Sequence, residues 1–140
     1  MTIDELLEQP YILIDILPEQ VPYKSPGRYF DVEKFYLSPS RYEVIREKFA
    51  SILLRLCCYY DLSLMIGEAD EILQNPDPAF LFDTVRNSDQ VLCLFAEDAL
   101  ITLKPDDLYL TVYNADARMK RLLEPLALAE GFFLREPEQA

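Results

Sequence analysis

The chain has 140 residues, of which 51% are hydrophobic and 12% aromatic, and its formal net charge is −12 at pH 7. This length predicts a single domain over residues 1–140, and the composition is typical of a chain that buries a core. The negative charge repels nucleic-acid phosphate and anionic lipid, so we expect neither as a partner. It favours a basic protein surface as partner, unless it serves only solubility.

The composition also excludes several kinds of active site. There is no histidine in the sequence, which excludes Ser-His-Asp and Cys-His catalysis and mixed Cys/His zinc sites. The three glycines, Gly27, Gly67 and Gly131, lie too far apart for a glycine-rich phosphate-binding loop. We therefore expect no cofactor, and we favour a binding protein over an enzyme.

The expected compartment is the cytoplasm. Residues 1–8 contain Asp4, Glu5 and Glu8, which is the opposite of a positively charged secretion signal. No apolar run approaches the roughly 20 residues that a membrane-spanning helix needs. In the cytoplasm the three cysteines are expected to be free thiols.

The first elements are a short helix and a strand. Thr2 followed by Glu5 is a capping-box pattern, which predicts a helix over residues 3–9 that ends at Pro10. The apolar run 11–17 lies between Pro10 and Pro18 and predicts a strand. Its single acidic residue is Asp15.

A proline- and tyrosine-rich loop is expected at about residues 18–39. Its first half must be extended or turning, because proline fixes φ and removes a backbone donor. Residues 29–37 fit both strand alternation and helical spacing. Tyrosine suits recognition surfaces, so Tyr23, Tyr29 and Tyr36 are the candidate partner-binding residues. The alternative is a loop that its aromatic side chains pin to the domain.

The strongest periodicity in the chain predicts a helix over about residues 40–60. Its core face is expected to carry Tyr42, Ile45, Phe49, Ile52, Leu53, Leu56 and Tyr60. Cys57 borders this face, and Cys93 lies in a predicted strand, so both are expected to pack in the core as small hydrophobic residues.

A second, weaker stripe is expected on the back of the same helix. It consists of small or apolar residues near seven-residue spacing: Val44, Ser51, Leu54 and Cys58. Either another part of the domain covers this stripe or a second copy of the chain does, which makes it a candidate face for a structural homodimer.

A strand at 62–67 is followed by an acidic turn with Glu68, Asp70 and Glu71. Clustered carboxylates after a strand could bind a divalent metal ion and support a small carboxylate-based enzyme or ligand-binding domain. The spacing matches no calcium-binding loop, and a solvated turn is the favoured interpretation. A short helix near 77–86 follows.

Three apolar runs then follow at about residues 90–113, and the links between them are so short that only antiparallel pairing is possible. They predict a three-stranded meander, followed by a helix at about 115–130 containing Pro125 and a final strand or extended tail at 132–136. The prediction is one α+β domain in which one or two further strands extend the meander and the helices at 40–60 and 115–130 pack on the sheet.

These observations favour a non-catalytic, protein-binding domain of the adaptor, inhibitor or immunity type. Its acidic, tyrosine-rich surface would contact a basic partner.

Overall fold

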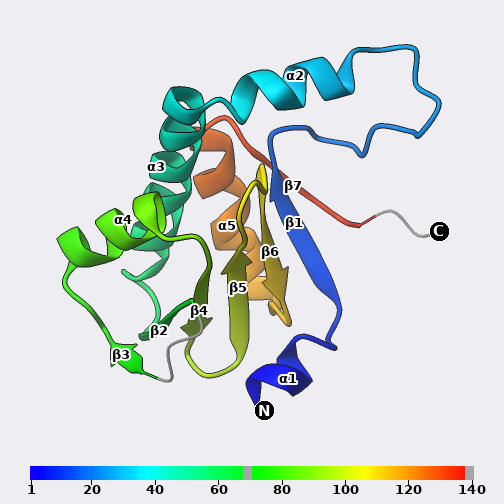
Figure 1. Cartoon of the computed structure of the whole chain (residues 1–140). Helices are drawn as coiled ribbons and strands as arrows, with labels where there is room; N and C mark the ends of the chain where they lie inside the picture. The colour runs from blue at the N-terminus through cyan, green and yellow to red at the C-terminus, as the bar shows by residue number, and fades with distance from the viewer. Residues whose placement is uncertain (68–70, 138–140) are drawn as a thin grey trace.

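One antiparallel sheet of seven strands organises the computed structural model, which describes residues 1–67 and 71–137 (Figure 1). The helices are α1 (Ile3–Leu6), α2 (Tyr29–Tyr36), α3 (Pro39–Leu56), α4 (Pro78–Asn87) and α5 (Ala117–Ala129). The strands are β1 (Tyr11–Asp15), β2 (Leu62–Ile66), β3 (Ile72–Gln74), β4 (Val91–Phe95), β5 (Ala99–Leu103), β6 (Tyr109–Tyr113) and β7 (Phe133–Arg135). The α+β prediction is confirmed.

The strand order is β3-β2-β4-β5-β6-β1-β7, and every neighbouring pair is antiparallel. The predicted meander at 90–113 is present as β4, β5 and β6. Two strands extend it on each side, where the sequence predicted one or two in all. Strands β1 and β7, from opposite ends of the chain, pair with each other beyond β6.

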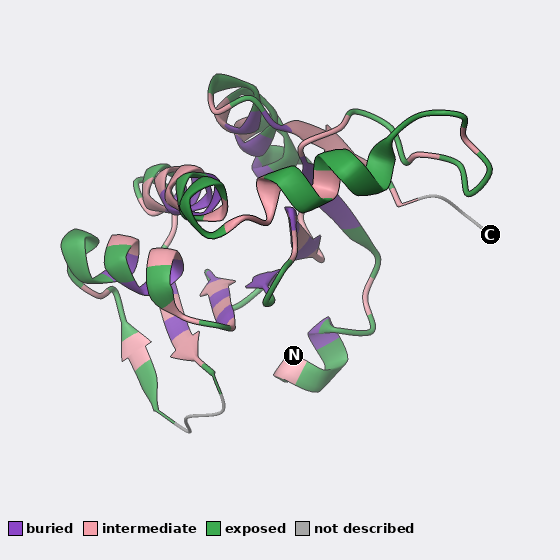
Figure 2. Ribbon diagram, turned by 45° about the horizontal axis from the view of Figure 1, so that its top comes forward, coloured by how far each residue is buried: buried purple, intermediate pink, exposed green. Residues whose placement is uncertain are grey.

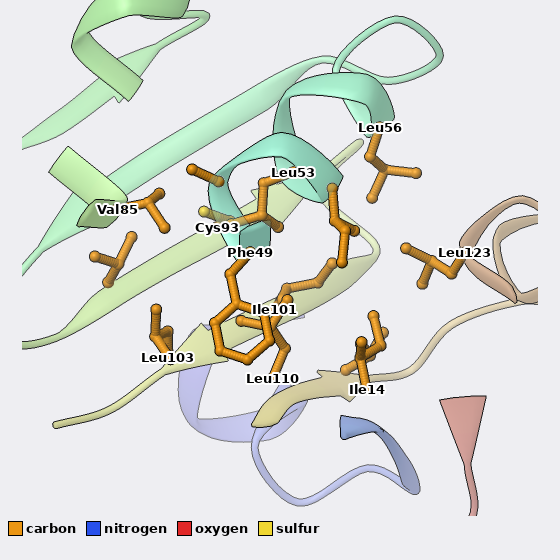
Figure 3. Packing of buried hydrophobic residues seen from close by; sticks show 14 of the residues in the cluster. Ile14, Phe49, Leu53, Leu56, Val85, Cys93, Ile101, Leu103, Leu110 and Leu123 are labelled. Carbon is orange, nitrogen blue, oxygen red and sulfur yellow. The ribbon is translucent and has the colours of Figure 1, made fainter. Parts of the chain in front are cut away.

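Helices α3 and α5 pack on one face of the sheet, and α4 packs against α3 (Figure 1). The hydrophobic core lies between these helices and the strands. The Phe49 side chain is fully buried, and its ring stacks on that of Phe132 with ring centroids 4.8 Å apart. In Figure 3, Phe49 and Leu53 of α3 lie over Ile101 and Leu110 of the sheet.

Helix α3 ends four residues earlier than the periodicity predicts. Its C-cap is Cys57, and the amides of Cys58 and Tyr59 bond to carbonyls only three residues back. This tightening turns the chain toward β2, which begins at Leu62. The predicted core face is correct for the residues from Ile45 to Leu56, whereas Tyr42 and Tyr60 are half-buried.

Arg46, which is buried, joins α3 to α4. Its Nε donates to the Val85 carbonyl at 2.8 Å and its Nη2 donates to the Ser88 carbonyl, both at the C-terminal end of α4. A cation suits this position because the last carbonyls of a helix lack partners and carry partial negative charge. One turn earlier, the Tyr42 hydroxyl donates to the Asp107 carbonyl at 2.9 Å.

Two undecided or approximate predictions are settled by the fold. Residues 29–36 form a helix, in which the amide of Val32 donates to the Arg28 carbonyl and the amide of Leu37 to the Glu33 carbonyl. Helix α1 has the predicted capping box at Thr2 and Glu5 but ends at Leu6.

Candidate functional site

The face of the sheet opposite α3 and α5 carries a row of polar and aromatic side chains. Successive strand residues point to opposite faces. Ile12 and Ile14 of β1 lie in the core, so Tyr11, Leu13 and Asp15 lie on the other face. The strand pairing places β6 and β7 residues beside them: Tyr109, Thr111, Tyr113, Phe133 and Arg135. We call this the open face.

A cavity of about 530 Å³ lies on the open face over β1, β6 and β7. The loop after β1, at residues 17–21, forms one side together with Tyr29 from the start of α2. Lys104 and Asp107 line it from the connection between β5 and β6. Because four tyrosines line it (Tyr11, Tyr29, Tyr109 and Tyr113), we call it the tyrosine cavity.

An ion pair between Asp15 and Arg135 lies in the tyrosine cavity. The Nε and Nη2 atoms of Arg135 are each 2.9 Å from Oδ2 of Asp15, while Oδ1 of Asp15 accepts from the amide of Ile16 at 2.6 Å. The side chains of Arg135 and Asp15 are only 11% and 12% exposed. Two charges held out of water in this way neutralise each other and fix β7 against β1.

The tyrosines of the cavity are in contact with one another and with acidic groups. The rings of Tyr11 and Tyr113, which are directly opposite in the strand pairing, have centroids 5.6 Å apart. Burial, the negative charge of Asp107 and the Tyr11 phenol raise the pKa values of Tyr109 and Tyr113, and Asp15 adds to the shift of Tyr109. These phenols therefore stay protonated at neutral pH and can donate hydrogen bonds, but cannot act as bases.

Tyr29 links the cavity to α2. Burial raises the pKa of Tyr29 to about 12, and its hydroxyl donates to Oε2 of Glu33 at 3.1 Å, which adds to the shift. Asp107 is also shifted: burial raises its pKa above the ordinary value for a carboxyl group. A carboxylate that is partly removed from water in this way gains most from a nearby cation.

Residues 18–37, which we call the arm, project from the sheet beside this cavity (Figure 1). Helix α2 has no buried residue, and its ribbon in Figure 2 shows only exposed and intermediate positions. Phe30 is 76% exposed and Tyr23 97% exposed. Phe35 is half exposed, with the guanidinium of Arg41 4.0 Å from the centre of its ring. The arm therefore carries large apolar side chains that the fold does not cover.

The three tyrosines predicted to bind a partner lie in different surroundings. Tyr23 is in the exposed loop, Tyr29 lines the tyrosine cavity, and Tyr36 is half-buried against the core at the end of α2. The structure therefore brings Tyr29 into a site and leaves Tyr23 free, while Tyr36 helps to anchor the arm.

The predicted dimer stripe is not continuous. Val44 is exposed on α3, but Leu54 packs against the core, and Ser51 is half-buried. Cys58 does not lie on α3, because the helix ends at Leu56 and Cys58 belongs to the turn that follows it.

The cysteines are free thiols and two of them are poor nucleophiles. Burial raises the pKa of the Cys57 thiol to about 11 and that of Cys93 further still. Cys93 is buried, as predicted, and Cys57 half-buried, while Cys58 is exposed. Core packing explains the first two without redox chemistry.

Two of the three predicted metal ligands, Glu68 and Asp70, lie outside the described residues, and Glu71 is exposed just before β3. Within residues 1–67 and 71–137, no group of three or more Cys, Asp or Glu side chains is arranged to hold a metal ion. Among the described helices, none is both long and apolar enough to cross a membrane.

Comparison with known proteins adds no relative. The chain matches no protein-family profile, no curated protein and no solved structure. The assignment of the candidate site therefore depends on the geometry of the structure alone.

Most residues of this site are not identifiable from the sequence pattern. Two local signals were present: the single acid Asp15 in an apolar strand, and the alternation that puts Tyr109, Thr111 and Tyr113 on one face of β6. The partner of Asp15 could not be found in this way, since Arg135 lies 120 positions along the chain.

Proposed function

We propose that the protein is a non-catalytic binding domain that docks a protein with a basic surface through the arm. The observation that carries the proposal is α2, a helix with no buried residue that exposes Phe30, Phe35 and Val32. Large aromatic residues are enriched in protein interfaces, so exposed aromatic side chains on a helix that buries none of its residues are candidate contacts for a partner.

The energetic argument concerns what folding leaves exposed. Burial of apolar surface stabilises a complex by roughly 25 cal/mol per Å², and buried aromatic side chains dominate many interfaces. Phe30 and Tyr23 keep most of their surface in water in the folded chain. A partner that covers them gains this free energy, and the rigid rings lose little side-chain entropy when they are covered.

Charge favours a basic partner. The chain carries 25 acidic and 13 basic residues, so its field accelerates association with a positively charged protein and repels an acidic one. The arm itself mixes both signs, with Lys24, Arg28 and Lys34 beside Glu19, Asp31 and Glu33. We infer that the exposed aromatic side chains of the arm supply the affinity for the partner, and that the negative charge of the chain orients the partner as it approaches. Free thiols suit a reducing compartment, and we place the domain in the cytoplasm.

The test is affinity capture with the full chain, followed by measurement with the purified partner. Wild type should retain a basic protein at low salt and less of it at high salt. Phe30→Ser should weaken binding by about tenfold or more if Phe30 is an interface anchor. Phe80→Ser is the matched control, because Phe80 is also exposed, at 45%, but lies on α4.

Capture of no protein at low salt, or equal loss of binding in the two variants, would contradict the proposal. A partner whose binding does not weaken with salt would contradict its electrostatic part.

A further inference from the structure

We infer that the tyrosine cavity is a binding site for a cationic side chain, the guanidinium of arginine or the ammonium of lysine, presented by the partner. The identity of the presenting protein rests on the proposed function, whereas the cavity and its chemistry stand on their own geometry. The cavity adjoins the arm through Tyr29, which belongs to both.

The size and shape of the site suit a side chain rather than a flat contact. Its volume of about 530 Å³ falls in the range of sites for small ligands. Strands β1 and β6 form the floor, and strands hold side chains more rigidly than loops do. A long side chain can enter over the sheet, between the loop 17–21 and the connection that carries Lys104 and Asp107.

The aromatic lining points to a cation. The face of a tyrosine ring attracts an ammonium or guanidinium group within about 6 Å of its centre, and cages of several rings select such ligands. Tyr11 and Tyr113 are tilted by 52° with centroids 5.6 Å apart, so they form a corner and not a flat stack. Tyr29 and Tyr109 complete the aromatic lining.

The charges agree with this assignment. The charged residues that line the cavity are three acids, Asp15, Glu19 and Asp107, and two bases, Lys104 and Arg135. Arg135 is already paired with Asp15, which leaves Glu19 and Asp107 against Lys104 alone. Burial is the main cause of the raised pKa values of Tyr29, Tyr109 and Tyr113, and nearby acids add to it: Glu33 for Tyr29, and Asp107 for Tyr109 and Tyr113.

The rival ligand is an anion held by Lys104, Arg135 and the phenol hydroxyls. It is less favoured because the guanidinium of Arg135 makes its contacts with Asp15 and Glu136. An anion would also enter against the field of a chain with a net charge of −12.

The experiment is an NMR titration of the isotope-labelled full chain with three probes. The first is N-acetyl-arginine methylamide, the second is the matched citrulline compound, which is nearly isosteric but uncharged, and the third is inorganic phosphate. The arginine probe should shift the amide signals of β1 and β6 and the ring signals of Tyr11 and Tyr113. The citrulline probe and phosphate should leave these signals unchanged.

Variants then assign the effect to the rings and the acid. Tyr11→Leu should weaken binding of the arginine probe about two- to fivefold. Tyr11→Phe, which keeps the ring and loses the hydroxyl, should bind the probe like wild type. Asp107→Asn should weaken binding of the arginine probe by a similar factor. Tyr59→Leu is the matched control, because Tyr59 is exposed and lies outside the cavity.

The inference is overturned if the arginine probe gives no shift at these strands, if citrulline shifts them equally, or if only phosphate does. If Tyr11→Leu does not fold, as judged by the dispersion of its amide spectrum, the three probes on wild type still decide. Partner capture without any effect of the arginine probe would refute this inference and leave the proposed function intact. Binding of the arginine probe without partner capture would refute the proposed function and leave this inference intact.

Discussion

The two faces of the sheet differ in what their side chains do. The face under α3 and α5 is almost wholly apolar, with Leu64, Cys93, Ile101 and Leu110 all at 1% exposure or less. The open face carries tyrosines, Thr111 and the Asp15–Arg135 ion pair. Because side chains alternate along a strand, the same five residues of β1 or β6 serve both faces. The covered face can thus supply the stability of the fold, while the open face carries polar and aromatic side chains that can bind a ligand.

The open face is nevertheless not an ordinary solvated surface. Leu100 and Thr102, which lie on it by alternation, are 0% and 4% exposed. Helix α1 contacts β5 and buries Leu6, so it covers part of this face. This cover lies over β5 and does not reach the tyrosine cavity, whose lining contains no residue of α1 and whose sides are the loop 17–21, Tyr29 and the connection that carries Lys104 and Asp107.

The largest effect is expected from truncating the centre of the covered face. Phe49→Ala should lower the free energy of unfolding by about 3 to 5 kcal/mol, because it removes a fully buried ring and leaves a cavity beside Phe132. Phe30→Ala, on the exposed side of the arm, should change it by less than about 0.5 kcal/mol. Urea unfolding of the two variants measures both values. An equal loss in both would mean that α2 contributes to the core.

A smaller effect is expected from the ion pair of the open face. Arg135→Met leaves Asp15 shielded without a partner and should cost about 2 to 3 kcal/mol, less than for a fully buried pair because some exposure remains. The matched control is Arg28→Met, which breaks an exposed pair with Asp31 and should cost less than about 0.5 kcal/mol.

Replacing both partners sharpens this prediction. The double variant Asp15→Leu with Arg135→Met should recover part of the loss in urea unfolding, because no unpaired charge remains. A single Arg135→Met variant as stable as Arg28→Met would show that the pair does not hold β7 to the sheet.

The smallest effect concerns the phenols of the open face at high pH. Tyr29, Tyr109 and Tyr113 have raised pKa values in the folded chain, whereas unfolded tyrosines titrate near pH 10. The folded state then binds more protons than the unfolded state above about pH 10, so the free energy of unfolding falls as the pH rises through the folded pKa values. Solvent screening keeps each contribution well below the roughly 1.4 kcal/mol per pH unit of a fully shifted group.

Absorbance of the tyrosinate ion, measured on the folded chain and on the chain in urea, tests this difference. The folded chain should ionise part of its nine tyrosines only at higher pH than the unfolded chain does. Coincident titration curves would show that the cavity is as wet as a free surface.

Features that depend on local pattern can be predicted from the amino-acid sequence of this chain. The periodicity from Ile45 to Leu56 sets the buried face of α3, and the short links within 90–113 permit only antiparallel strands. The capping box at Thr2 and Glu5 consists of local hydrogen bonds that a few neighbouring residues specify. These predictions succeeded because their physical causes lie within a few residues of one another.

The candidate site, in contrast, is formed by strand pairings between distant parts of the chain. The pairing of β1 with β7 joins Asp15 to Arg135, and the pairing of β1 with β6 sets Tyr11 against Tyr113. Contacts between residues about 100 positions apart leave no periodic signal in the sequence, because what holds them together is the pairing order of the whole sheet.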